Sequence, residues 1–168
     1  MRLSDHFTFE EACFSDTATR NGVKNEPGVD EWANMRKASD GMESVRTLLG
    51  RPIRINSWYR CEDLERILCK KDYEGWLVRR GLTRDDESWA LYFAGKAHPK
   101  GWAIDFTCAD YGTPKDLVRF LQSTALTFDQ LLFEGTWVHI SFAPAMRREV
   151  LTASFGASGV PTYTQGVV

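Results

Sequence analysis

The sequence predicts an α+β fold, in which a small sheet carries helices on its flanks. One observation is a run of apolar residues at helical spacing between Trp32 and Leu49, with Gly50 in the position of a C-terminal cap. The other is the alternation of apolar and other residues in segments 102–107 and 137–142, which is typical of half-buried strands. With 168 residues and 43% hydrophobic content, the chain can bury one core of ordinary domain size.

Three further elements follow from local signals. The sequence TFEE at residues 8–11 matches a capping box, because a threonine hydroxyl and a glutamate carboxylate three residues later can bond each other's terminal amides. It predicts a short first helix. Residues 52–57 alternate as a half-buried strand does, and Thr113-Pro114 opens a helix with proline at its first position.

The predicted domain covers residues 1–150 and contains a helical insertion at about residues 61–95. This insertion is charged and has three apolar residues on one helical stripe, namely Leu64, Ile67 and Leu68. The segment 151–168 consists largely of Gly, Ser, Thr and Val without periodicity, so a loosely ordered C-terminal tail is expected there.

Alternation also decides which side chains share a face of the sheet. Positions 102, 104 and 106 are apolar in one strand, and positions 138, 140 and 142 are apolar in the other. If these apolar faces pack on the core, Asp105 and His139 emerge together on the opposite face. A pair of metal ligands would need this arrangement.

The bulk properties exclude several classes of function. Lys and Arg total 21 against 23 for Asp and Glu, so the charge gives no footprint for nucleic acid. No apolar stretch approaches the ~20 residues that cross a bilayer. Since no apolar segment follows Met1 and Arg2 and the four cysteines form no C-x-x-C pair, we expect synthesis in the cytoplasm with reduced thiols.

The chain has three histidines, and two of them lie beside the strands just described. His139 interrupts an apolar and aromatic strand, and His98 precedes the strand that holds Asp105. Catalytic zinc sites commonly use three nitrogen or oxygen ligands and leave a fourth position for water. Two imidazoles and one carboxylate fit such a site, so His98, Asp105 and His139 are the candidate ligands of Zn²⁺. The residues alone also allow the other reading, in which the strand histidine is a hydrogen-bonded residue of the core.

Several blocks of the sequence resemble the M15 peptidases, the D-alanyl-D-alanine carboxypeptidase family. AHPKGWAID at residues 97–105 resembles the family's H-x-x-G-x-A-x-D motif, and SWYR at residues 57–60 resembles its S-x-Y-R segment. DQLLFE at 129–134 and WVHIS at 137–141 resemble its closing D-Q-L and W-V-H segments, and LSDHFT at 3–8 resembles the start of its short phage and prophage members. The resemblance implies a small antiparallel sheet with flanking helices, as in hedgehog and D-Ala-D-Ala peptidase domains.

The resemblance places zinc on the same three residues and adds a general base just before the last histidine. Family members often have E-x-x-H there, but Thr136 occupies that position and the nearest carboxylate is Glu134. Glu134 is therefore the predicted base, with Asp129 as the alternative. An offset of five would put Glu134 and His139 on opposite faces of one continuous strand, so Gly135 and Thr136 must form a turn or bulge.

Arg60 is the second predicted catalytic residue, because its guanidinium can bind a carboxylate or an oxyanion through a planar fork of donors. The predicted substrate-binding residues are Ser57, Tyr59 and Asp129. Ser57 has a second reading, as a support for Arg60.

The resemblance implies a zinc-dependent hydrolase that cuts an amide bond in the peptide stem of bacterial peptidoglycan. We expect a monomer. The short form predicts a phage or prophage endolysin-type endopeptidase that reaches the cell wall after release, or a virion-associated enzyme. One alternative is a D,D-carboxypeptidase or dipeptidase on D-Ala-D-Ala. The other is a zinc-containing binding domain of the same fold without catalysis, because a fold alone does not secure activity.

Overall fold

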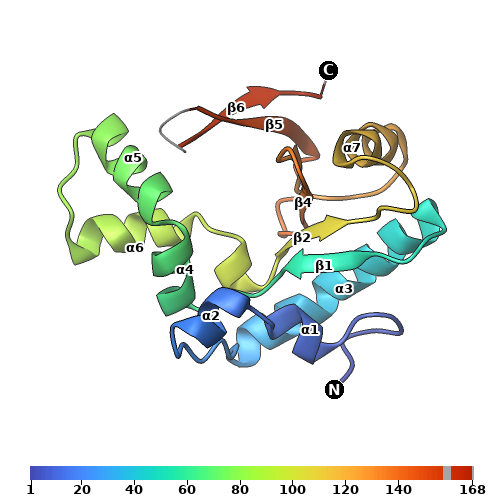
Figure 1. The fold of residues 1–168 in the computed structure, drawn as a ribbon, viewed down its shortest axis with the longest axis horizontal. Coiled ribbons are helices and arrows are strands. Elements are labelled where there is room, and N and C mark those ends of the chain that lie inside the picture. The colour runs from blue at the N-terminus through green and yellow to red at the C-terminus, as the bar shows by residue number, and fades with distance from the viewer. Residues whose placement is uncertain (157–159, 168) are drawn as a thin grey trace.

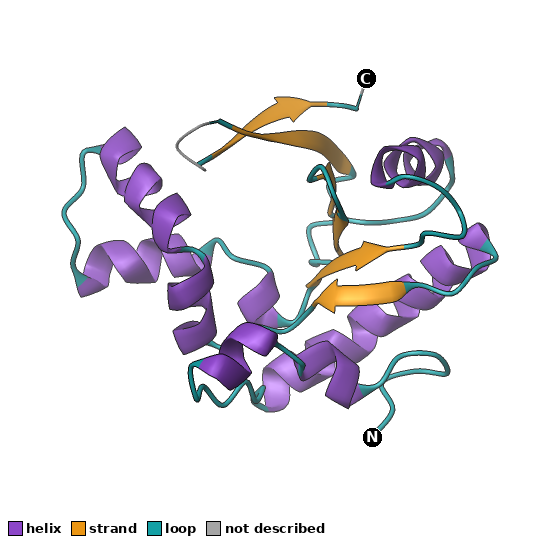
Figure 2. Cartoon of the chain, in the orientation of Figure 1, coloured by secondary structure: helices purple, strands orange, loops and turns teal. Residues whose placement is uncertain are grey.

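The structure, a computed structural model, describes residues 1–156 and 160–167 of the chain and is a mixed α+β fold (Figures 1 and 2). The α+β prediction is confirmed. Its helices are α1 (Phe9–Cys13), α2 (Asp16–Arg20), α3 (Val29–Leu49), α4 (Glu62–Leu68), α5 (Lys70–Arg80), α6 (Asp86–Ala94), the 3-10 helix η1 (His98–Lys100) and α7 (Pro114–Ser123). Its strands are β1 (Arg54–Ser57), β2 (Ala103–Thr107), β3 (Gln130–Phe133), β4 (Val138–Ser141), β5 (Glu149–Phe155) and β6 (Pro161–Gln165).

The helix ends follow the local signals in the sequence. The hydroxyl of Thr8 accepts a hydrogen bond from the amide of Glu11 at the start of α1. Thr113 and Asp116 form a complete capping box at the start of α7. Gly50 ends α3 in the left-handed region, with φ of 60°.

The six strands form one sheet in the order β1-β2-β4-β3-β5-β6. Every neighbouring pair is antiparallel except β3 and β5, which run parallel. The sheet is therefore mostly antiparallel and larger than the small antiparallel sheet that we expected. Its register brings one residue from each strand into a single row across the sheet, and this row is Ser57, Asp105, His139, Leu132, Leu151 and Gln165.

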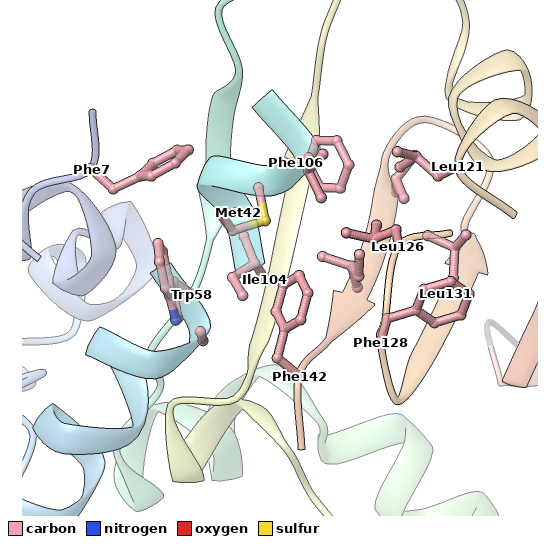
Figure 3. Packing of buried hydrophobic residues seen from close by; sticks show 14 of the residues in the cluster. Phe7, Met42, Trp58, Ile104, Phe106, Leu121, Leu126, Phe128, Leu131 and Phe142 are labelled. Carbon is pink, nitrogen blue, oxygen red and sulfur yellow. The ribbon is translucent and has the colours of Figure 1, made fainter. Parts of the chain in front are cut away.

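The main core lies between the sheet and helices α1, α3 and α7 (Figure 3). The inward residues of β2 and β4 pair directly, Ile104 with Ile140 and Phe106 with Val138. All four are fully buried. The apolar faces of both strands therefore pack on the core as the alternation predicts, and the odd positions lie on the other face.

Helices α4, α5 and α6 fill the segment in which a helical insertion was expected, and they lie to one side of the sheet in Figure 1. α5 and α6 share an aromatic cluster of their own, with Tyr73, Leu77, Trp89 and Tyr92 buried. The stripe predicted for α4 is only partly correct. Leu64 is buried, but Ile67 and Leu68 are exposed by 40% and 44%, and the buried neighbour of Leu64 is Glu65.

The segment predicted as a loosely ordered tail, residues 151–168, instead contains β6 and most of β5. Residues 157–159 and 168 of that segment lie outside the described part of the chain. Valine, threonine, tyrosine and phenylalanine favour strands, and β5 completes its hydrogen bonding beside β3. Composition concealed these strands, because glycine and serine in the connection masked the flanking β-formers.

None of the described helices is long and apolar enough to cross a membrane.

Candidate metal centre

His98 lies in η1, in a turn that packs closely against α3. Gly101 ends this turn with φ of +77°, and a Cβ there would lie 2.7 Å from Met35 Cγ and 2.8 Å from the carbonyl oxygen of Glu31. Only glycine fits both the backbone conformation and the close approach. The sequence HPKG therefore fixes the distance between the histidine and the core helix.

Trp58 orients the His98 ring. Its indole Nε1 donates to the carbonyl oxygen of Gly101 at 3.0 Å, and its own carbonyl oxygen lies 2.6 Å from His98 Nδ1. A carbonyl only accepts, so Nδ1 carries the proton and Nε2 is the unprotonated nitrogen that can bind a metal. A backbone group thus selects the tautomer of His98.

Asp105 and His139 face each other across β2 and β4, as the alternation argument predicts. Asp105 Oδ1 lies 2.9 Å from His139 Nδ1 and 3.3 Å from His98 Nε2. One ligand atom from each of the three residues lies within 4.8 Å of the others. The structure therefore brings together the three ligands predicted from the sequence.

The geometry and chemistry of this group fit zinc. Metal–ligand bonds of about 2.0 to 2.1 Å in a tetrahedron put neighbouring ligand atoms about 3.3 Å apart, close to the separations seen around Asp105 Oδ1. Two imidazole nitrogens and one carboxylate oxygen are a donor set that zinc accepts while keeping a position for water. His98, Asp105 and His139 would hold the ion.

The charges around the three residues keep the carboxylate ionised. Burial alone would raise the pKa of Asp105, but His98, His139 and the Arg60 guanidinium hold it well below its usual range. Burial lowers the pKa of His98, and the Arg60 charge lowers it further. Burial also acts to lower the pKa of His139, yet its hydrogen bond to Asp105 and the charges of Asp105 and Glu134 raise it overall.

Arg60 lies in the connection between β1 and α4, and its side chain contacts the candidate metal ligand Asp105. Its Nη2 donates to Asp105 Oδ2 at 2.5 Å, and its Nε donates to Ser57 Oγ at 2.9 Å. Asp105 thus turns one oxygen to the histidines and the other to Arg60. Ser57 takes the supporting position that was one of its two predicted roles.

Glu134 lies in the turn between β3 and β4, and this turn resolves the problem of its odd offset from His139. The amide of Glu134 donates to the carbonyl of Trp137 at 3.1 Å, and a γ-turn is centred on Gly135 with φ of +77°. Glu134 therefore sits opposite Trp137, two positions from the Leu132–His139 pair on each strand. Positions two apart share a face, so Glu134 and His139 lie on the same side of the sheet.

Trp137 also fixes the Glu134 side chain. Its indole Nε1 donates to Glu134 Oε2 at 2.6 Å. The predicted turn at Gly135 and Thr136 thus brings the carboxylate into the cavity that the candidate metal ligands line. Trp137 binds one of its two oxygens.

Two predicted site residues lie elsewhere. Tyr59 is buried in the main core, and burial raises its pKa to about 12. Asp129 is 3% exposed, and its carboxylate accepts hydrogen bonds from Arg147, with Nε to Oδ1 at 2.8 Å and Nη2 to Oδ2 at 2.7 Å. Neither lines the cavity that contains the metal ligands, so their substrate contacts stay predictions.

That cavity has a volume of about 690 Å³ and joins three parts of the fold. The sheet contributes Asp105, His139, Leu132 and Glu134, next to His98 and Arg60. The helices α4 and α5 and the turn before η1 contribute a charged side, with Glu65, Lys70, Lys71, Asp72 and Lys96. The C-terminal strands contribute an apolar side, with Leu151, Phe155, Pro161 and Tyr163.

Reasoning from the sequence missed Glu65 and the whole C-terminal side of this cavity. For Glu65 the available signal was its place five residues after Arg60, on a helix whose apolar stripe is weak. For the C-terminal side the signal was the pair of short runs rich in β-branched and aromatic residues, EVLTASF and PTYTQ.

Residues 5–68 match a family model described as Peptidase M15. The matched residues include Ser57 and Arg60 and end before the three candidate metal ligands. No curated protein and no solved structure matches the chain significantly. The family match agrees with the resemblance of the sequence motifs, and over residues 5–68 it supports an M15 family peptidase.

Proposed function

We propose that the chain is a zinc metallopeptidase that hydrolyses an amide bond in the peptide stem of bacterial peptidoglycan. The observation that carries this proposal is the convergence of His98, Asp105 and His139 in one cavity with Arg60 and Glu134. Three ligands, a carboxylate base and a cationic donor are the parts that metal-assisted amide hydrolysis requires. The family match over residues 5–68 supports the reaction class.

A zinc ion held there would polarise the scissile carbonyl and bring the pKa of a bound water toward neutrality. Trp137 engages Glu134 Oε2, so Oε1 is the oxygen that takes the proton from the attacking water. Glu134 then passes this proton to the leaving amine. The remaining N–H groups of Arg60 donate to the oxygen that becomes negative, in a geometry set beforehand by Ser57 and Asp105.

The substrate class rests on the family resemblance, and the cavity is compatible with it. A stem peptide has carboxylate and small apolar side chains. The cavity offers Lys70 and Lys71 on its charged side, where Lys96 pairs with Asp72, and aliphatic and aromatic residues on the other side. We propose an endolysin-type endopeptidase of phage or prophage origin, made in the cytoplasm and acting at the wall after release or from a virion. We also propose that it acts as a monomer.

The test combines metal analysis with digestion of purified peptidoglycan. Purified protein should contain one zinc per chain and release new amino groups, and mass spectrometry of the products should locate the cleaved bond. His139→Ala should lose both zinc and activity. His6→Ala is the matched control. His6 is the one histidine of the chain that is not a candidate ligand, and it pairs with Glu43, so its removal should leave zinc content and activity unchanged.

The products separate the candidates. Cleavage inside the stem supports an endopeptidase, and release of terminal D-alanine instead supports the D,D-carboxypeptidase alternative. If the protein binds stoichiometric zinc but releases no amino groups, the enzyme proposal is wrong, and a zinc-containing binding domain without catalytic activity is favoured. Activity that survives in His139→Ala would overturn the assigned metal centre.

A further inference from the structure

Glu65 is a buried carboxylate at the wall of the cavity, and it has no part in the proposed reaction. It lies on α4 and is 1% exposed. Its Oε1 accepts from the thiol of Cys69 at 2.9 Å. Its Oε2 is buried and has no hydrogen bond among the residues that the structure describes.

The partner of this oxygen is Arg60, whose Nη1 lies 3.7 Å from Oε2. Burying a carboxylate is strongly unfavourable unless it is paired, and a thiol is only a weak donor. A helix position this buried is usually occupied by an apolar residue, as it is at the neighbouring Leu64. The charge of Glu65 is therefore best explained by its attraction to the Arg60 guanidinium.

Three side chains hold Arg60, and each is directed to a different nitrogen. Ser57 accepts from Nε and Asp105 accepts from Nη2, so both lie along one edge of the guanidinium. Glu65 faces the remaining nitrogen, Nη1. Without Glu65, only one edge of the guanidinium would be restrained, and Asp105 would be the only carboxylate paired with Arg60 at short distance.

We propose that Glu65 is a positioning residue that fixes the plane of the Arg60 guanidinium and limits how strongly Arg60 pulls on Asp105. This inference rests on the proposed function in that Arg60 would assist the reaction. Glu65 acts through Arg60, so its removal lowers kcat and leaves KM nearly unchanged.

The kinetic test is a double-mutant cycle between Glu65→Gln and Arg60→Lys. Glu65→Gln should lower kcat by about 10-fold or more, the usual size for residues that orient a catalytic group. In the Arg60→Lys background the same change should lower kcat by less than about 2-fold, because the residue it orients has already been altered. An equal factor in both backgrounds would overturn the proposal.

The control is Glu62→Gln, the same substitution on an exposed part of the same helix, where Glu62 pairs with Arg66. It should leave kcat unchanged. Glu65→Asp keeps the charge and should retain more activity than Glu65→Gln at equal zinc content. The reverse order of these two variants would contradict the assignment.

A second measurement does not depend on catalysis. The Arg60 Nε–H resonance of the zinc-loaded protein, assigned by its loss in Arg60→Lys, should exchange with water at least about 10-fold faster in Glu65→Gln than in the wild type. Unchanged exchange would overturn the proposal. If the wild-type protein hydrolyses no peptidoglycan, the proposed function fails, and the exchange rate alone decides the role of Glu65.

Discussion

Gly101→Ala should destabilise the protein more than another glycine substitution with the same backbone conformation, because Gly101 faces packed atoms. Gly50 and Gly101 have φ of +60° and +77°, but nothing lies within 4 Å of a Cβ at Gly50. A Cβ at Gly101 would meet Met35 Cγ at 2.7 Å and the backbone oxygen of Glu31 at 2.8 Å. The side chain of Met35 can move, whereas a backbone oxygen in α3 cannot move without the helix.

The magnitude follows from these two contributions. The left-handed conformation costs about 1 kcal/mol for alanine relative to glycine, and this is the whole effect expected for Gly50→Ala. Overpacking against α3 adds about 1 to 3 kcal/mol for Gly101→Ala. The expected loss in the free energy of unfolding is therefore about 2 to 4 kcal/mol at Gly101.

Urea unfolding of the zinc-free proteins, followed by tryptophan fluorescence, measures both losses without a contribution from metal binding. Gly101→Ala should also weaken zinc binding, since His98 lies in the displaced turn, whereas Gly50→Ala should not. If the two variants lose equal stability, the packing of the His98 turn against α3 does not constrain the candidate metal centre.

Three other perturbations test separate parts of the structure. Removing zinc with a chelator should lower the unfolding temperature, and about 4 kcal/mol of stability should return at zinc concentrations 1,000-fold above Kd, as measured by calorimetry; no change on removal would contradict the metal centre. Asp129→Asn should destabilise the zinc-free protein by about 1 to 3 kcal/mol at pH 7. Hydrogen bonds from Arg147 lower the pKa of Asp129, so this stability is present above the unfolded pKa and is lost as the pH falls through the folded pKa. Urea titrations at several pH values measure this, and a stability difference between wild type and Asp129→Asn that persists in acid would contradict it. Tyr163→Ala should raise KM for peptidoglycan fragments several-fold, because Tyr163 lines the cavity, and Thr162→Ala on the other face of β6 should not; equal effects would argue against a substrate-binding role for β6.

The sequence predicts best the features that depend on local periodicity. The Asp105–His139 pair follows from alternation in two strands, and the ends of α3 and α7 follow from capping residues. His98 could be placed near them because a short turn leads directly into β2. The caps need only local contacts, whereas the Asp105–His139 pair also needs β2 and β4 to lie side by side, which alternation alone does not show.

The features that sequence reasoning missed depend on contacts between distant segments. β5 joins the sheet by pairing with β3. Glu65 is buried in contact with Arg60 and Cys69, although its charged neighbours on α4 predict an exposed face. Asp129 illustrates the opposite case. It has the chemistry of a site residue, but Arg147, 18 residues later, pairs with both of its carboxylate oxygens.

In the turn between β3 and β4, the number of residues matters more to the site than their identity. Glu134 and His139 share a face only because two residues, Gly135 and Thr136, connect opposing positions of the hairpin. Many residues could replace Thr136 without altering this geometry. One added or deleted residue would shift the register and turn either Glu134 or His139 to the other side of the sheet. A search for related sites by spacing along the chain would pass over this arrangement, whereas a search by cross-strand partner would find it.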